Sequence, residues 1–335
     1  MSRYRLSGYI FIVLVALFFK AAQAHHSHVG INRHDVRVFK GVVVKYAWNM
    51  PHVFMKVKAP NSTGEIVLYS IEMQSPPAMA MLGWSKESFS PGDRLTWQGA
   101  HHRDKSRYYT DMQWAEKSDG SRFVMEEGEA QEAAQPSTDF SGLWDRDDPG
   151  GFKPHYQPPT GWPLTEKGQK LVDNFHEDQN PMIECGNPGP PKSMLIPYPL
   201  DIRRRNADTI TMERELMADV RVIHLTNKPP KFQPSTIGHS IGRFEEEELI
   251  VETTDFVADR WGSHTGIDSS AQKHLLERFS LSKDGMYLHA KITLTDPVYL
   301  AEPVTFTHRW RKVPDRQVIQ APCTEESAKL YLQAE

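Results

Sequence analysis

The sequence predicts an all-β protein made of two barrels, a small OB-like barrel followed by a larger antiparallel, lipocalin-like barrel. Three observations lead to this prediction. Short runs that alternate apolar and polar residues recur along the chain, turn residues separate them, and only one or two segments have a helical pattern. A length of 335 residues is also more than one small domain needs, which favours two domains.

The charge and composition exclude several classes of protein. The 39 Lys and Arg residues are scattered among 43 Asp and Glu residues, for a formal net charge of −4. Nucleic acid is not an expected partner, because a phosphate backbone needs a basic patch. The hydrophobic fraction of 39% is enough for a core, and the negative mean hydropathy excludes a protein with many membrane spans.

The first 24 residues have the pattern of a secretory signal peptide. Arg3 and Arg5 precede an apolar run of 11 residues from Tyr9 to Phe19, and small residues follow up to Ala24. The run is shorter than the roughly 20 residues with which a helix crosses a bilayer, so no stable membrane insertion is expected after cleavage. We therefore expect a periplasmic or secreted protein whose mature chain begins at His25.

Export changes the interpretation of the two cysteines. An oxidising compartment favours a disulfide between Cys185 and Cys323. The alternative is two free, buried thiols. No zinc-type spacing of paired cysteines is present in the sequence.

The OB-like barrel is predicted over residues 25–125, because several short strands there are separated by turns rich in Gly, Asn, Asp and Ser. A short helix is expected from Ala78 to Leu82. The acidic stretch 126–138 has four Glu and no large apolar residue, which is typical of a linker. The strands are expected at 41–48, 53–58, 65–73, 94–99, 108–114 and 122–125.

The second barrel is predicted over residues 139–335. One helix is expected from Thr165 to about His176, with Thr165 as its N-cap. Alternation of apolar and polar residues then predicts strands with one wet face. These strands are expected at 207–215, 219–226, 248–254, 273–281, 286–294 and 304–311.

Separated motifs in residues 25–125 carry a resemblance. They are His25-His26-Ser27, Trp48-Asn49-Met50-Pro51-His52, the strand ending at Glu72, Leu82-Gly83-Trp84-Ser85 and Pro91-Gly92-Asp93. In these motifs the chain resembles a bacterial family of exported proteins of unknown function, with the pattern HHS, W-x-N-P-H, W-x-x-E, L-x-x-G-W-S and G-D. It departs from that pattern by inserting Met50 and by placing Tyr69 where the family usually has Trp.

The second half is similar to another uncharacterised exported module, which occurs alone or beside the first. Its marks here are 139–144, Cys185 with 188–190, 197–199, 221–223, 238–243, 274–278, 296–297 and Cys323. Neither resemblance implies an activity.

The mature N-terminus provides a candidate metal site. The α-amine and a ring nitrogen of His25 can chelate one ion, and His52 would complete a three-nitrogen set suited to copper. Glu72 is a candidate carboxylate on an adjacent strand. Possible substitutes for His52 are His26, His28, His34, His101 and His102. The alternatives are a solvated histidine-rich tail and a histidine that caps a backbone carbonyl.

A second candidate site follows from strand parity. Glu277 shares an apolar strand face with large hydrophobic residues, and Arg221 and His308 are its best inward-facing partners. These three could orient a largely apolar ligand inside the barrel, with His239 and His274 in the surrounding loops. Glu277 could also serve as a general acid or base. The alternative is a buried ion pair that only fixes the register of the strands.

A hydrolase or lyase that acts in the second barrel is the third possibility. The string from Gly238 to Gly242 satisfies G-x-S-x-G around Ser240, although no hydrophobic strand precedes it and no obvious helix follows it. Nearby loops also contain Asp255, His264, Ser269, Ser270 and His274. From the sequence we expect an exported protein that binds a small, largely apolar molecule in its second barrel. The second functional class is a copper or other metal protein, including an oxidoreductase.

Overall fold

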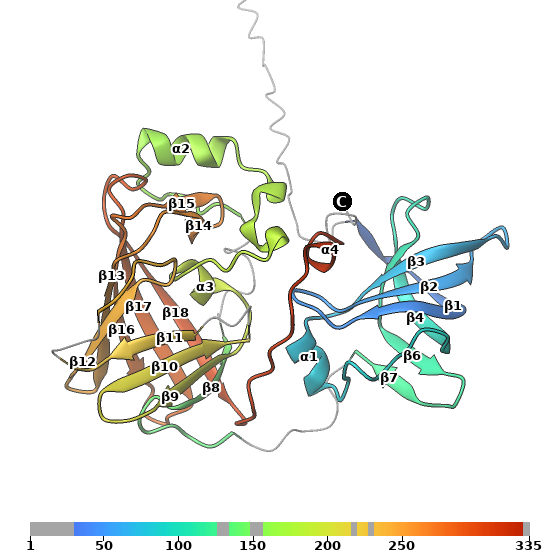
Figure 1. Cartoon of the computed structure of the whole chain (residues 1–335), viewed down its shortest axis with the longest axis horizontal. Coiled ribbons are helices and arrows are strands. Elements are labelled where there is room, and N and C mark those ends of the chain that lie inside the picture. Colours follow the sequence, from blue (N-terminus) through green and yellow to red (C-terminus); the bar gives the residue numbers. More distant parts are fainter. Residues whose placement is uncertain (1–29, 126–133, 148–156, 216–219, 227–230, 331–335) are drawn as a thin grey trace, which may run out of the picture.

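The computed structural model describes residues 30–125, 134–147, 157–215, 220–226 and 231–330. Apart from one two-stranded hairpin, its strands form two separate sheets of barrel type, as expected, with few and short helices (Figure 1). The predicted signal peptide and most of the predicted linker lie outside the described residues. Within the described ranges, no helix has the length and apolar character that crossing a bilayer requires.

The first sheet contains a five-stranded barrel in the order β1-β2-β3-β5-β4, which closes because β1 also pairs with β4. The helix α1 (Pro76–Met81) connects β3 to β4, close to the position predicted for it. This arrangement confirms the OB-like prediction. The strands are β1 (Ile31–Ala47), β2 (Phe54–Pro60), β3 (Ile66–Glu72), β4 (Arg94–His102) and β5 (Tyr109–Asp111), with β6 (Trp114–Lys117) and β7 (Arg122–Val124) extending the sheet.

Two glycines allow the strands of this barrel to approach closely. A Cβ atom at Gly41 would lie 2.5 Å from the carbonyl oxygen of Lys58 on β2. A Cβ at Gly99 would lie 1.9 Å from the carbonyl oxygen of Asp111 on β5. Any side chain at either position would push a neighbouring strand away, so both glycines are required where the sheet bends to close.

The second sheet is a closed barrel of nine strands in the order β10-β11-β12-β13-β16-β17-β18-β8-β9. The pairs are antiparallel, as predicted, except that β11 and β12 are parallel. The strands are β8 (Gly142–Arg146), β9 (Leu200–Arg204), β10 (Thr209–Arg214), β11 (Val220–His224), β12 (His239–Glu245), β13 (Glu248–Thr254), β16 (His274–Leu281), β17 (Tyr287–Thr295) and β18 (Val304–Val313).

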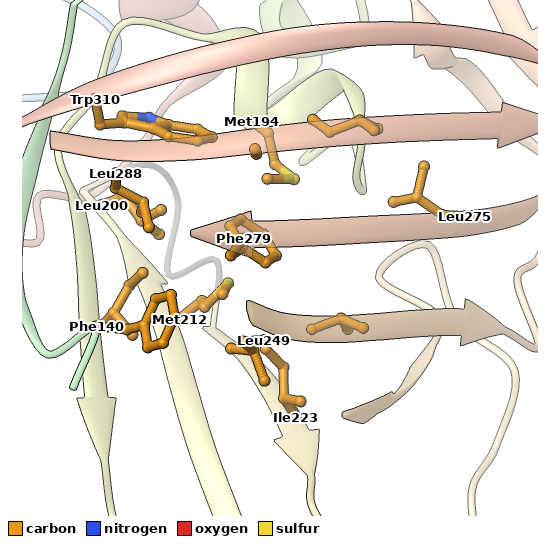
Figure 2. Close-up of a cluster of buried hydrophobic side chains, with 14 of the residues drawn as sticks. Phe140, Met194, Leu200, Met212, Ile223, Leu249, Leu275, Phe279, Leu288 and Trp310 are labelled. Atoms are coloured by element: carbon orange, nitrogen blue, oxygen red, sulfur yellow. The ribbon is translucent and has the colours of Figure 1, made fainter. Parts of the chain in front are cut away.

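Alternate residues of these strands point inward and fill the barrel with apolar side chains (Figure 2). On β17, for example, Leu288, Ala290, Ile292 and Leu294 are all buried, whereas His289 between them is exposed. Buried and non-buried residues therefore alternate along the strand, as the sequence predicted. Large aromatic side chains also contribute to it, among them Trp144, Phe279 and Trp310.

Short elements are attached to the second barrel. α2 (Glu166–Asp173) begins at Thr165, whose side chain accepts a hydrogen bond from the Gly168 amide as predicted, but it ends three residues before the predicted His176. α2 contacts the hairpin of β14 and β15, and α3 contacts β14 (Figure 1). The remaining elements are η1 (Glu177–Gln179), η2 (Pro181–Glu184), α3 (Lys192–Leu195), β14 (Asp259–His264), β15 (Ile267–Ser269) and α4 (Glu325–Ala328).

The segment after β18 leaves the second barrel and packs against the first one (Figure 1). It carries Cys323, which forms the predicted disulfide with Cys185. The Met50 amide donates a hydrogen bond to the Pro322 carbonyl at 2.9 Å, and Met50 is buried among residues of both halves. Further along, Leu330 lies in a cluster with Phe54 of β2. The end of the chain thus makes contacts with both barrels.

Candidate functional site

The second barrel holds a buried ion pair between Arg221 of β11 and Glu277 of β16. Nη1 of Arg221 donates to Oε1 of Glu277 at 3.0 Å, and Nη2 donates to Oε2. Arg221 also donates from Nε to Ser240 Oγ at 2.7 Å and from Nη2 to Thr253 Oγ1 at 2.5 Å. Arg221 and Glu277 thus lie together inside the second barrel, as the parity of their strands predicted.

This ion pair is satisfied within the protein. Both carboxylate oxygens of Glu277 accept hydrogen bonds, and all three nitrogens of the Arg221 guanidinium donate one. A buried pair with this many partners needs no ligand to offset its desolvation. The geometry therefore favours the structural alternative, in which the pair fixes the register of the strands.

The other residues predicted to contact a ligand lie elsewhere. His308 is buried and packs edge-on against Trp310, with ring centroids 4.3 Å apart. His308 pairs with Ala290 on the neighbouring strand, and Ala290 pairs with Phe279 on the next one. Phe279 is the inward-facing residue that follows Glu277, so His308 lies one inward-facing position further along the barrel than Glu277. His239 stacks on Phe232, and the exposed ring of His274 contacts Glu252 at 2.7 Å. Parity places His239 and His274 on the outer face.

The hairpin of β14 and β15 buries a second group of polar side chains. Ser263, His264 and Ser269 are 0%, 3% and 1% exposed. Within the described part of the chain, Ser263 Oγ, His264 Nδ1 and Ser269 Oγ have no hydrogen-bond partner. Buried polar atoms normally have a partner, so three in one hairpin require an explanation such as bound water or a ligand.

Two buried lysines accompany this hairpin. Lys192 of α3 donates to Thr265 Oγ1 at 2.5 Å, and Lys273 donates to the Pro190 and Gly262 carbonyl oxygens. Burial lowers the pKa of each lysine to about 7. Burial, and next the charge of Lys192, lower the pKa of His264 to about 3. At neutral pH His264 is thus a neutral ring with one donor and one acceptor nitrogen.

Apolar side chains connect the polar hairpin to the barrel core. His264 packs edge-on against Trp162 at 5.1 Å between ring centroids, and Trp162 stacks on Phe306 at 6.0 Å. Trp162 and Phe306 both pack against the core cluster, and Met194 of α3 belongs to it. The arrangement places neutral and cationic polar groups beside an apolar interior, which is the composition of small-molecule sites.

The structure does not form a nucleophile elbow at Ser240. Ser240 is an interior residue of β12, is 1% exposed, and exchanges hydrogen bonds with Arg221 and Thr253. An elbow requires a sharp turn from a strand into a helix with the hydroxyl exposed. The string from Gly238 to Gly242 instead begins a strand, and another strand, β13, follows it.

In the first barrel, the structure brings His52 and Glu72 together. Nδ1 of His52 lies 3.0 Å from the Met73 carbonyl oxygen and 3.3 Å from Oε1 of Glu72. The hydroxyl of Tyr109 donates to the other carboxylate oxygen, Oε2, at 2.5 Å. Glu72 and Tyr109 are buried, whereas 31% of the His52 side chain is exposed. Burial, and next the charge of Glu72, raise the pKa of Tyr109 well above its usual value.

The remaining predicted metal ligands are not part of this group. His101 and His102 are buried and bond to nearby backbone groups, and burial lowers the pKa of His101. His34 is exposed on β1. His25, His26 and His28 lie outside the described residues. Among the residues that are described, no three His, Cys, Asp or Glu side chains gather to hold a metal.

Sequence reasoning missed Tyr109, Lys192 and Ser263. Tyr109 falls in a predicted strand, and only the pairing of β5 beside β3 places it next to Glu72. Lys192 follows Pro190 and Pro191, in a segment for which no helix or strand was predicted. The available signal was the position of this lysine, between Pro191 and the apolar residues Met194 and Leu195. A long charged side chain is seldom surrounded by buried residues.

The comparisons with known proteins concern the first barrel. Residues 13–111 match the model of a family of unknown function, DUF6152. The match ends at Asp111, the last residue of β5, and includes His52, Glu72 and Tyr109. It agrees with the resemblance to an uncharacterised family. No curated protein and no solved structure matches the chain.

Proposed function

We propose that the protein is exported to the periplasm or beyond and binds a small, largely apolar molecule in its second barrel. The polar end of that molecule would meet the β14 and β15 hairpin. One observation carries this proposal: Ser263 Oγ, His264 Nδ1 and Ser269 Oγ are buried and lack partners among the described residues. A ligand carrying hydrogen-bonding groups would satisfy these atoms, and each satisfied atom avoids a desolvation cost of about 1–3 kcal/mol.

The surroundings support this choice of ligand chemistry. Trp162 contacts both His264 and Phe306, and Trp162 and Phe306 pack against the core cluster to which Met194 belongs. Apolar walls with a few convergent polar groups are typical of sites for small organic molecules. Arg221 and Glu277 would hold the strands beneath the site, while Lys192 would favour an acidic or otherwise electron-rich polar end.

Export is supported by the disulfide between Cys185 and Cys323, since such bonds persist in oxidising compartments. A second candidate function is metal binding in the first barrel. It is favoured by the polar group that His52 and Glu72 form there. The two functions use different barrels and do not exclude each other.

Native mass spectrometry of the protein purified from a bacterial periplasm tests the ligand proposal. We expect an organic adduct of a few hundred daltons on the wild type. His264→Leu removes the unpartnered ring nitrogen at similar volume, and it should reduce the adduct strongly. The control is His274→Leu, which changes an exposed histidine on the outer face and should leave the adduct unchanged.

Displacement of the fluorescent dye 1-anilinonaphthalene-8-sulfonate gives an independent measurement, because the dye combines an aromatic body with an anionic group. Dye binding that is weakened by His264→Leu and by Ser263→Ala would agree with the proposal. Wild-type protein without any adduct, and with dye binding insensitive to both substitutions, would contradict it.

A further inference from the structure

We propose that the outer face of the first barrel is a docking surface for a membrane that contains anionic phospholipids. The protein would lie against the surface of that membrane without crossing it. This docking surface, the outer patch, consists of exposed apolar and cationic side chains of β1, β2 and β3: Val38, Lys40, Val42, Lys58, Ile66 and Leu68. The proposal is independent of ligand binding in the second barrel.

The pairing of three neighbouring strands places the centre of the outer patch on one side of the sheet. Val42 of β1 pairs with Lys58 of β2, and Lys58 pairs with Leu68 of β3. Residues directly opposite each other in a sheet point to the same side. The adjacent pair, Val43 and Val57, belongs to the core and therefore points the other way. The row from Val42 to Leu68 thus lies on the outer wall of the barrel.

The apolar side chains of the outer patch are open to solvent. Every second residue of a strand faces the same side, so Val38 and Lys40 extend the row along β1, and Ile66 extends it along β3. The exposed fractions are 57% for Val38, 63% for Ile66 and 48% for Leu68. Single apolar residues on a surface are normal, but a group of them on adjacent strands marks an interaction site.

Unpaired cations accompany these apolar residues. Val42 pairs with Lys58 on one side and with Arg94 of β4 on the other, and Lys40 lies two residues away on β1. Within the described ranges, none of these three cations forms an ion pair, whereas other lysines of the barrel, such as Lys117, do. Unpaired positive charge beside apolar side chains complements a partner that is both negative and partly apolar.

The chain covers the other end of the same outer face. Phe54 lies four residues before Lys58 on β2 and therefore faces the same side. It is 2% exposed, because it is buried in a cluster with Ala100 of β4 and with Leu330 of the chain end. The outer patch is the part of this face that the described segments leave open.

The shape and charge of the outer patch favour a membrane over other partners. In a two-fold dimer formed through this face, Lys40 and Lys58 would meet like charges. A peptide ligand usually occupies a groove or a sheet edge, whereas the outer wall of a closed barrel is convex. At a bilayer surface, apolar side chains enter the boundary between headgroups and acyl chains, and lysines reach the lipid phosphates. Anionic lipids add an attraction for each basic residue near the surface.

Co-sedimentation with vesicles tests this proposal. The experiment uses the full chain purified from a bacterial periplasm, with vesicles of equimolar phosphatidylglycerol and phosphatidylcholine, and with phosphatidylcholine vesicles as the reference. The variants are Lys58→Glu and Leu68→Ser. The matched controls lie on the second barrel: Lys291→Glu changes an exposed lysine of β17, and Val222→Ser changes a residue of β11 that is 39% exposed.

We expect the wild type to bind the anionic vesicles and not the reference vesicles. Lys58→Glu and Leu68→Ser should each lower the binding constant about tenfold, because one reverses a charge and the other removes apolar contact. Salt at about 0.5 M should weaken wild-type binding by screening the charges. The two control substitutions should leave binding unchanged.

Three results would overturn the proposal. One is a wild type that stays in the supernatant with both kinds of vesicle. Another is binding that Lys58→Glu and Lys291→Glu weaken equally. The third is a dimer detected by light scattering that Leu68→Ser dissociates, because that result would assign the outer patch to a second copy of the chain.

A measurement on the wild type covers the case in which a variant does not fold. The N-hydroxysuccinimide ester of acetic acid acetylates accessible lysines, and mass spectrometry of peptides locates the product. Anionic vesicles should protect Lys40 and Lys58 from acetylation but leave Lys291 reactive. Equal acetylation of Lys40 and Lys58 with and without vesicles would refute the docking surface.

Discussion

Arg221 and Glu277 form a two-pronged ion pair across strands that are not neighbours. In the order of the barrel, β12 and β13 separate β11 from β16, and each contributes an inward hydroxyl to the pair, Ser240 and Thr253. Four successive strands thus share one polar row inside an apolar barrel. The row is specific for one alignment of the strands, since a shift by one residue would turn every one of these side chains outward.

Removing one partner of this pair should destabilise the protein strongly. Glu277→Leu leaves the guanidinium of Arg221 buried without its counter-charge, because Arg221 is 5% exposed. We expect a loss of about 3–5 kcal/mol in the free energy of unfolding. Urea denaturation followed by circular dichroism measures this loss.

The double variant Arg221→Met with Glu277→Leu is the matched control. It replaces both charges by apolar side chains of similar size, so most of the loss should be recovered. A double variant no more stable than Glu277→Leu would mean that the polar row contributes more than charge compensation.

The disulfide should contribute a large part of the stability. Cys185 and Cys323 are separated by 138 residues in sequence, and closing a loop of this length restricts the unfolded chain by about 4–5 kcal/mol in the chain-entropy model. Replacing both residues with serine should lower the urea midpoint accordingly. Adding reductant to the wild type should give the same shift, whereas reductant should not affect the double serine variant.

The stability should also depend on pH through Lys192. Burial lowers its pKa from 10.5 to about 7 in the folded protein, so the unfolded chain binds more protons between these values. Stability contributed by this group therefore rises with pH above about 7 and is unchanged below it. Between pH 7.5 and 9, the wild type should gain about 1–2 kcal/mol more than Lys192→Met.

Urea titrations of both proteins at several pH values measure this difference. Lys273, which shares the lowered pKa, is present in both, so its contribution cancels. Parallel stability curves for the two proteins would show that Lys192 keeps its charge in the folded state.

The periodic elements were predictable from the sequence because their signals are local. The strand 248–254 and the N-cap at Thr165 agree with the structure at the residue level. The inward positions of Arg221 and Glu277 follow from parity alone. The candidate polar hairpin was not predictable in this way, because Ser263 and His264 lie in a loop-like stretch whose burial depends on α2 and α3.

The path of the chain end could not be predicted from the sequence either. Residues 139–335 were assigned to the second barrel, yet Pro322 and Leu330 contact the first one. Non-local contacts of this kind have no periodic signature. The insertion at Met50, which looked like a departure from the family motif, is in the structure a buried residue in the contact between the two halves.

The contact at Met50 gives the last prediction. Met50 is 1% exposed and packs with Ile196, Tyr198 and Ala321 of the other half. Met50→Ala should create a cavity there and cost about 2–5 kcal/mol. The control is Lys45→Ala, which removes an ion pair to Glu326 between side chains that are 50% and 65% exposed and should cost less than about 1 kcal/mol. Limited proteolysis should cleave Met50→Ala near the chain end faster than the control. Equal cleavage rates would mean that the disulfide alone holds the chain end against the first barrel.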